Sequence, residues 1–265
     1  MSMNLFKNLF AILLLTLTAL AFGVGVPLDR SSADWLRLVI SGFLGLTLAD
    51  ILLFEALHRM GASRFAIVDT LYAPLVVALS CVFLGESLTW SFIGGAVVVI
   101  AGIAMATIQR GALTVDSAAV RIGFLYGFAS VACNAMGVIL AKPVLEHSSL
   151  IEVTWTRLVI GFAIQFGWVA VTRQWTLAQR AFIPNAQWWT LIPAAFVGTY
   201  LSLMLWLGGF KWADASVAAV LNQMATVYIL ILARVILGET LRPAQVAGTS
   251  FAAAGALWIV LSRLS

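Results

Sequence analysis

Two stretches of the sequence, AIVDTLYAPLVVALSCVFLGE at residues 66–86 and AVLNQMATVYILILARVILGE at residues 219–239, lie in one register. Each is an apolar run that ends in Leu-Gly-Glu, and 239 − 86 gives an offset of 153 residues between the two glutamates. The same offset aligns further pairs: Trp35 with Trp188, Gly45 with Gly198, Ala62 with Ala215, Gly95 with Gly248, and Gly102 with Gly255. One register held over this length indicates an internal repeat.

The composition around these stretches is that of a membrane protein. Of 265 residues, 62% are hydrophobic and 10% are charged, whereas a soluble domain has about 25% charged residues. Lys and Arg stand singly or in pairs beside apolar runs, which argues against a nucleic-acid partner despite the net charge of +4. We therefore predict an all-α, polytopic helix bundle in the lipid bilayer of the inner or plasma membrane.

Nine spans are expected, and they fall into two unequal halves. The predicted spans are 5–26, 36–57, 64–84, 90–109, 121–141, 150–172, 188–210, 215–236 and 244–262. Four belong to a first repeat at residues 1–110 and five to a second repeat at residues 121–263. The span at 121–141 has no partner in the first half, so we expect that the first repeat lacks its opening helix, through a shortened start or as a true nine-span variant.

The order of motifs resembles one transporter family. In each half, a small-residue start (Gly61-Ala62-Ser63 or Asp214-Ala215-Ser216) precedes a span that ends in Leu-Gly-Glu, and a Gly-rich span follows. This pattern resembles the EamA-type branch of the drug/metabolite transporter superfamily. The resemblance implies a carrier for small metabolites, such as an exporter of amino acids or related compounds, that works by alternating access. The resemblance normally implies ten helices.

Pro74 predicts a helix break in the first half only, because Val227 is its repeat partner.

The candidates for the substrate and ion pathway are polar residues at membrane depth, where charge is costly. Asp69 lies one turn before Tyr72, and its repeat partner Asn222 is followed by Gln223, so polar positions recur at equivalent depth. They fit a polar substrate or a coupling proton, or hydrogen bonds between helices. Asp50 has no basic residue nearby and is the alternative relay acid, whereas Glu55 is expected to pair with Arg59.

Other candidates follow from single side chains. Arg157 near the start of its span could bind a substrate carboxylate or extend to the lipid headgroups. Trp206 is a candidate substrate contact, and Asn134 lies among small residues that suit either helix packing or a ligand. Glu86 and Glu239 are predicted to act in helix-end turns and packing. The helix-packing glycines are Gly95, Gly102, Gly248 and Gly255.

Rival functions need features that the sequence largely lacks. It has no ATP-binding loop, no zinc-protease or hydrolase motif and only two histidines, so we predict no cofactor, no metal and no enzymatic activity. A membrane enzyme or flippase-like protein for lipid-linked substrates would have to use Asp50, Glu55 and His58. A non-transporting partner subunit is the other alternative, because a half of four helices is incomplete.

Overall fold

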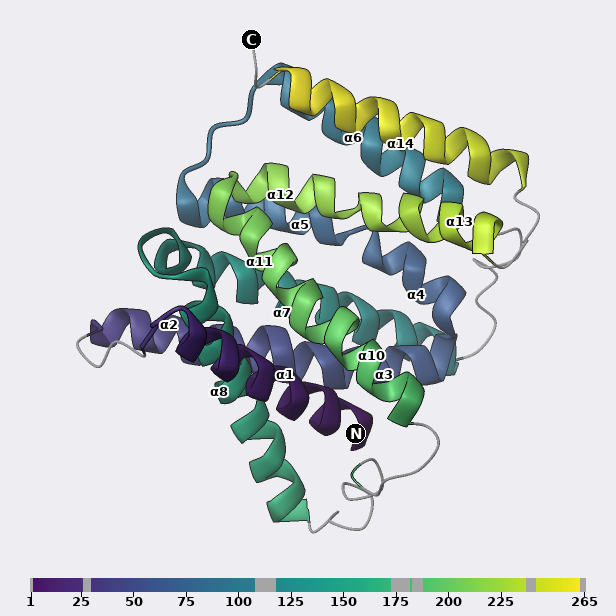
Figure 1. Ribbon diagram of the computed structural model, residues 1–265. Helices are drawn as coiled ribbons and strands as arrows, with labels where there is room; N and C mark the ends of the chain where they lie inside the picture. The colour runs from purple at the N-terminus through teal and green to yellow at the C-terminus, as the bar shows by residue number, and fades with distance from the viewer. Residues whose placement is uncertain are drawn as a thin grey trace. The chain divides into compact units, whose positions relative to one another are not determined.

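A computed structural model describes residues 2–25, 30–107, 118–172, 182, 188–236 and 242–262, and these are almost entirely helical (Figure 1). The elements of the first half are α1 (Ser2–Ala21), α2 (Ser32–Gly42), η1 (Phe43–Leu48), α3 (Ala49–Met60), α4 (Ala62–Asp69), α5 (Tyr72–Leu79), η2 (Ser80–Leu84) and α6 (Trp90–Thr107). Those of the second half are α7 (Ala118–His147), α8 (Leu150–Thr172), α10 (Trp188–Ala195), η4 (Phe196–Leu201), α11 (Ser202–Trp212), α12 (Ala215–Asn222), α13 (Met224–Ile236) and α14 (Pro243–Ser262).

The helices confirm an all-α membrane fold. Among the described residues, seven helical segments are long and apolar enough to cross a membrane, and Trp90–Ala106 is a shorter apolar helix. Each predicted span overlaps a helix or an interrupted helix, but the span predicted at 215–236 is divided into α12 and α13 and is not among these seven segments. The largest difference is α7, which has 30 residues where 121–141 was predicted, because the helix continues through Pro143 to His147.

Two spans are interrupted at repeat-equivalent positions. α4 ends at Asp69 and α5 begins at Tyr72, while α12 ends at Asn222 and α13 begins at Met224. Since 69 + 153 = 222, the interruptions share one register. The expectation of a break in the first half alone was wrong: α12 stops without a proline, after which the Gln223 amide donates to the Val220 carbonyl at 3.2 Å, a tighter turn than the α-helix.

A second pair of irregular segments follows the same register. η1 and η4 are both π-helical, and their bounds, 43–48 and 196–201, differ by 153. π-Helical turns are rare and frequently mark functional sites. Their occurrence at the same offset in both halves shows that they belong to the repeated unit. Gly137 of α7 packs against the backbone of Gly45. A Cβ added to Gly137 would lie 2.9 Å from the Cα atom of Gly45. Gly198 is the repeat partner of Gly45, and a Cβ added to Gly198 would meet nothing within 4 Å.

The described chain forms two compact units, each with helices from both halves. Unit 1 comprises Met1–Leu48 and Met136–Trp212, and unit 2 comprises Ala49–Ala135 and Ala213–Ser265. In unit 1, α1 and α2 pack on α8. Polar pairs join these helices: Asn8 donates to Gln165 at 3.2 Å, and the Trp155 indole donates to the Thr16 hydroxyl at 2.9 Å. Such bonds satisfy polar groups that lipid cannot.

Unit 2 is organised around the α6–α14 pair, which lies side by side in Figure 1. Gly95 faces Gly255 and Gly102 faces Gly248, so the two helices run antiparallel. A Cβ on Gly102 would lie 2.6 Å from the Gly248 carbonyl oxygen, and one on Gly255 would lie 2.9 Å from the Gly95 carbonyl oxygen. The offset of 153 residues relates Gly95 to Gly248 and Gly102 to Gly255, so the two contacts are equivalent by the repeat. The backbones therefore approach closely at both small-residue positions.

Candidate functional site

The interrupted helices of unit 2 meet at their breaks. The Gln223 side-chain amide donates to the Asp69 backbone carbonyl at 3.2 Å. Asp69 is the last residue of α4, where carbonyl groups lack the partners that a continuous helix supplies. Next to it, the Thr70 and Leu71 amides donate to the Ile67 and Val68 carbonyls at 3.3 and 3.0 Å. A side chain from one half thus satisfies a backbone group that the break in the other half has freed.

Burial separates the residues at these breaks into two groups. Gln223 is 6% exposed and Tyr72 is 5% exposed, so both belong to the packed interior of unit 2. Asp69 and Asn222, the repeat-equivalent pair, have exposed side chains. The arrangement holds the two breaks together through a buried amide and leaves a carboxylate and a carboxamide accessible beside them. The carboxylate can accept a proton, and the carboxamide can hydrogen-bond a polar solute.

Two further candidates of unit 2, Asp50 and Asn134, lie on α3 and α7. Asp50 is half-buried in the first turn of α3, where the neighbouring Ala49 carbonyl accepts a hydrogen bond from the Ser130 hydroxyl at 2.7 Å. Asn134 is half-buried on α7. Glu55 pairs with Arg59 at 3.2 Å, as its spacing predicted. Asp50 is therefore close to a contact between helices, whereas Glu55 forms a local ion pair.

Arg157 and Trp206 come together in unit 1. Arg157 lies on α8 and is 1% exposed, and its guanidinium carbon is 5.9 Å from the centre of the Trp206 ring on α11. Trp206 also packs edge-on against Phe210, with ring centres 5.3 Å apart. A guanidinium over an aromatic face is a favourable pair when it is removed from water. This burial differs from the exposed headgroup position that the alternative interpretation required.

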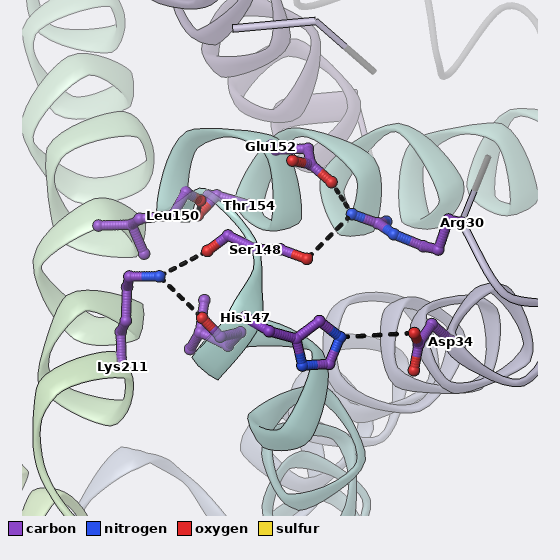
Figure 2. Close-up of polar contacts among 9 residues, drawn as sticks. Arg30, Asp34, His147, Ser148, Leu150, Glu152, Thr154 and Lys211 are labelled. Carbon is purple, nitrogen blue, oxygen red and sulfur yellow. Dashed lines mark hydrogen bonds and ion pairs between the residues drawn. The ribbon is translucent and has the colours of Figure 1, made fainter. Parts of the chain in front are cut away.

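A polar network that the sequence did not reveal ties unit 1 together where α7 ends and α8 begins (Figure 2). Arg30 forms an ion pair with Glu152 in the first turn of α8 and donates to the Ser148 hydroxyl. Lys211 at the end of α11 donates to the Leu145 carbonyl at 2.9 Å and to the Ser148 carbonyl. The Nε2 atom of His147 lies 3.4 Å from the Oδ2 atom of Asp34, and the two side chains face each other in Figure 2.

Within this network, the Arg30–Glu152 pair is largely removed from water. The side chains of Arg30 and Glu152 are 4% and 10% exposed. Burial lowers the pKa of the Arg30 guanidinium from its ordinary value, while the negative charge of Asp34 raises it. No local motif links Arg30 to Glu152, because 122 residues separate them in sequence. The contact depends on the tertiary fold of unit 1.

Removing one partner of this buried pair is expected to destabilise the protein strongly. Glu152→Ala leaves the Arg30 charge without its carboxylate, and such losses cost about 3–5 kcal/mol. Unfolding of the purified protein by a denaturing detergent measures the free energy. Glu55→Ala, which breaks the more exposed pair with Arg59, is the control, with an expected cost of about 0–1 kcal/mol. Equal losses in the two variants would contradict a structural role for the Arg30–Glu152 pair.

The two Leu-Gly-Glu motifs differ in what can be described. Glu86 accepts hydrogen bonds from the amides of Ala215 and Ser216. Glu239 lies outside the described residues.

Among the described residues no group of three or more His, Cys, Asp or Glu side chains could hold a metal ion, so Asp50, Glu55 and His58 form no such cluster.

Comparisons with known proteins agree with this architecture. The sequence model of the EamA-like transporter family matches residues 1–108 and 121–261. A relative described as an uncharacterized transporter, from Synechocystis sp., is 26% identical over 246 residues, which are 87% of this chain and 67% of the relative. The fold is similar to that of a protein of known crystal structure, with a TM-score of 0.79 at 19% identity, over 100% of this chain and 89% of the other.

The family match covers most of the chain, and the helices are long and apolar enough for a multi-pass protein of the cell membrane. The internal repeat and the relative described as a transporter agree with this match. The chain is a membrane transporter that belongs to the EamA-like transporter family.

Proposed function

We propose that this transporter is a secondary carrier that moves small polar metabolites, such as amino acids, by alternating access. The observation that carries the proposal is the pair of helix breaks joined by the Gln223–Asp69 contact. Interrupted helices at equivalent positions of two repeats form the substrate and ion sites of many secondary carriers, because their ends expose backbone groups inside the membrane. We further propose that the repeats span residues 1–110 and 121–263, in support of which the family matches at 1–108 and 121–261.

The residues near the breaks receive specific roles in this proposal. Asp69 or Asp50 carries the coupling proton, and Asn222 hydrogen-bonds the substrate. Tyr72 and Gln223 shape the break from its buried side. Asn134 contributes a half-buried carboxamide on α7. In unit 1, Arg157 with Trp206 offers a cation and an aromatic face for the carboxylate of a substrate.

Proton-coupled flux in proteoliposomes tests the proposal. Purified protein is reconstituted with a pH-sensitive dye inside, and amino acids are added one at a time from a panel that covers acidic, basic, polar and apolar side chains. At least one is expected to produce a proton flux. Asp69→Asn or Asp50→Asn is expected to abolish it, because an amide cannot exchange a proton at neutral pH.

The outcomes separate coupling from transport. If both variants keep the full proton flux, the coupling assignment is wrong. If labelled amino acid still enters without proton flux, the protein is a uniporter. If the purified chain moves no member of the panel in either assay, the proposal of an amino-acid carrier that acts without a partner is contradicted. Glu55→Gln, whose residue forms a local ion pair with Arg59, is the matched control.

A further inference from the structure

The Leu84-Gly85-Glu86 motif forms a turn that presents Glu86 at the end of η2. Gly85 has φ 68° and ψ 22°, a left-handed conformation that glycine adopts without strain. A Cβ at Gly85 would meet nothing within 4 Å. The position therefore favours glycine because of its left-handed backbone, and not because a side chain would clash. The Glu86 amide then donates to the Ser80 carbonyl at 3.3 Å and closes the turn.

The Glu86 carboxylate binds the beginning of α12, which belongs to the other half of the chain. Its Oε1 atom accepts from the Ala215 amide at 2.6 Å and its Oε2 atom from the Ser216 amide at 3.1 Å. Both residues are buried, at 0% and 1% exposure. The first amides of a helix lack intrahelical partners, and a carboxylate there also opposes the positive end of the helix dipole. Through these two bonds Glu86 caps the start of α12.

The other end of α12 lies at the paired breaks. α12 has eight residues, which corresponds to about 12 Å, and its residues 215–220 are all buried. It packs along α5, as Figure 1 shows. Gln223 directly follows α12 and donates to the Asp69 carbonyl. A short buried helix is therefore held at its start by Glu86 and at its end by Asp69, both from the first half.

We propose that Glu86 is a positioning residue: by holding the start of α12, its carboxylate places Gln223 against Asp69 and so keeps the two helix breaks together. The motif then does more than end a helix. It links a turn outside the break to the geometry of the break itself, within unit 2. The role in transport rests on the proposed carrier function, whereas the mechanical link between Glu86 and the breaks does not.

Hydrogen–deuterium exchange on the full chain in lipid nanodiscs tests this link without a substrate. Glu86→Gln keeps the size of the side chain, but its amide nitrogen cannot accept a hydrogen bond, so one of the two cap bonds and the charge are lost. We expect about tenfold faster exchange in the peptide that contains Ala215 and Ser216, the factor that corresponds to about 1.4 kcal/mol. We expect a similar rise for the peptide that contains Thr70 and Leu71.

The second peptide decides between positioning and a local cap. A cap that served α12 alone would speed exchange at Ala215 and Ser216 and leave Thr70 and Leu71 unchanged, which would overturn the proposal. No change in either peptide would also overturn it. Glu86→Asp keeps both acceptor oxygens and is expected to restore part of the protection at both places; failure of this rescue, with Glu86→Gln unstable, would assign Glu86 to folding alone.

A control and a second assay complete the test. Glu55→Gln, whose carboxylate pairs locally with Arg59, should leave both peptides unchanged. The proton-flux assay is run on the same preparations. If wild-type protein transports no amino acid but Glu86→Gln still loosens both peptides, the proposed function fails and the positioning role stands; the reverse result removes the positioning role alone.

Discussion

Gly248→Leu is expected to prevent the chain from folding. A Cβ at Gly248 already lies 2.5 Å from the Gly102 carbonyl oxygen and 2.6 Å from the Ala106 amide nitrogen. Both are backbone atoms, so no side-chain rotation relieves the clash and α6 and α14 must separate. Lipid does not drive helices together as water does, so their association depends on such close packing. Alanine alone should cost about 1–3 kcal/mol, and leucine more.

The yield of monodisperse protein and its thermal unfolding in detergent measure this effect. Gly167→Leu is the matched control, because Gly167 is an exposed helical glycine on α8 where an added Cβ would meet nothing within 4 Å. The control should fold in normal yield, since leucine is a better helix former than glycine. A Gly248→Leu protein as stable as the Gly167→Leu protein would show that the α6–α14 contact does not hold unit 2 together.

Much of the helix pattern could be predicted from the sequence because lipid imposes a length and an apolar composition on each span. The register of 153 residues also located positions of common structure: Gly95 and Gly248 lie in equivalent contacts with Gly255 and Gly102. The apolar spans and the repeat offset can be recognised in the sequence itself, without knowledge of which helices touch.

The break at Gln223 could not be predicted from proline, because the chain there has none. The Gln223 side chain instead donates to Asp69, a contact between residues 154 apart, and only the tertiary fold brings them together. The same holds for Glu86, whose acceptor atoms meet amides 129 and 130 residues away. The π-helical segments η1 and η4 contain no proline themselves, although Pro193 lies three residues before η4. The shared offset of Gly45 and Gly198 marks the repeat but does not by itself predict a π-helix.

The second large effect concerns the environment of the paired breaks. If Asn222 lies on a transport pathway, water reaches it within the membrane. A thiol reacts with charged reagents as the thiolate, which needs water, so a thiol in lipid reacts slowly. Asn222→Cys, in a chain with Cys81→Ala and Cys133→Ala, should therefore react readily with a water-soluble methanethiosulfonate. Phe251→Cys is the control, because Phe251 is an apolar residue on α14 that is 57% exposed.

The most direct test of the paired breaks as the transport site is this labelling rate in nanodiscs, where the reagent reaches both faces of the membrane. The account predicts that Asn222→Cys reacts at least about tenfold faster than Phe251→Cys, because an aqueous site favours the thiolate and a lipid-facing site does not. Equal, slow labelling of the two thiols would place Asn222 in lipid and contradict the assignment of the Asp69–Gln223 breaks as the pathway.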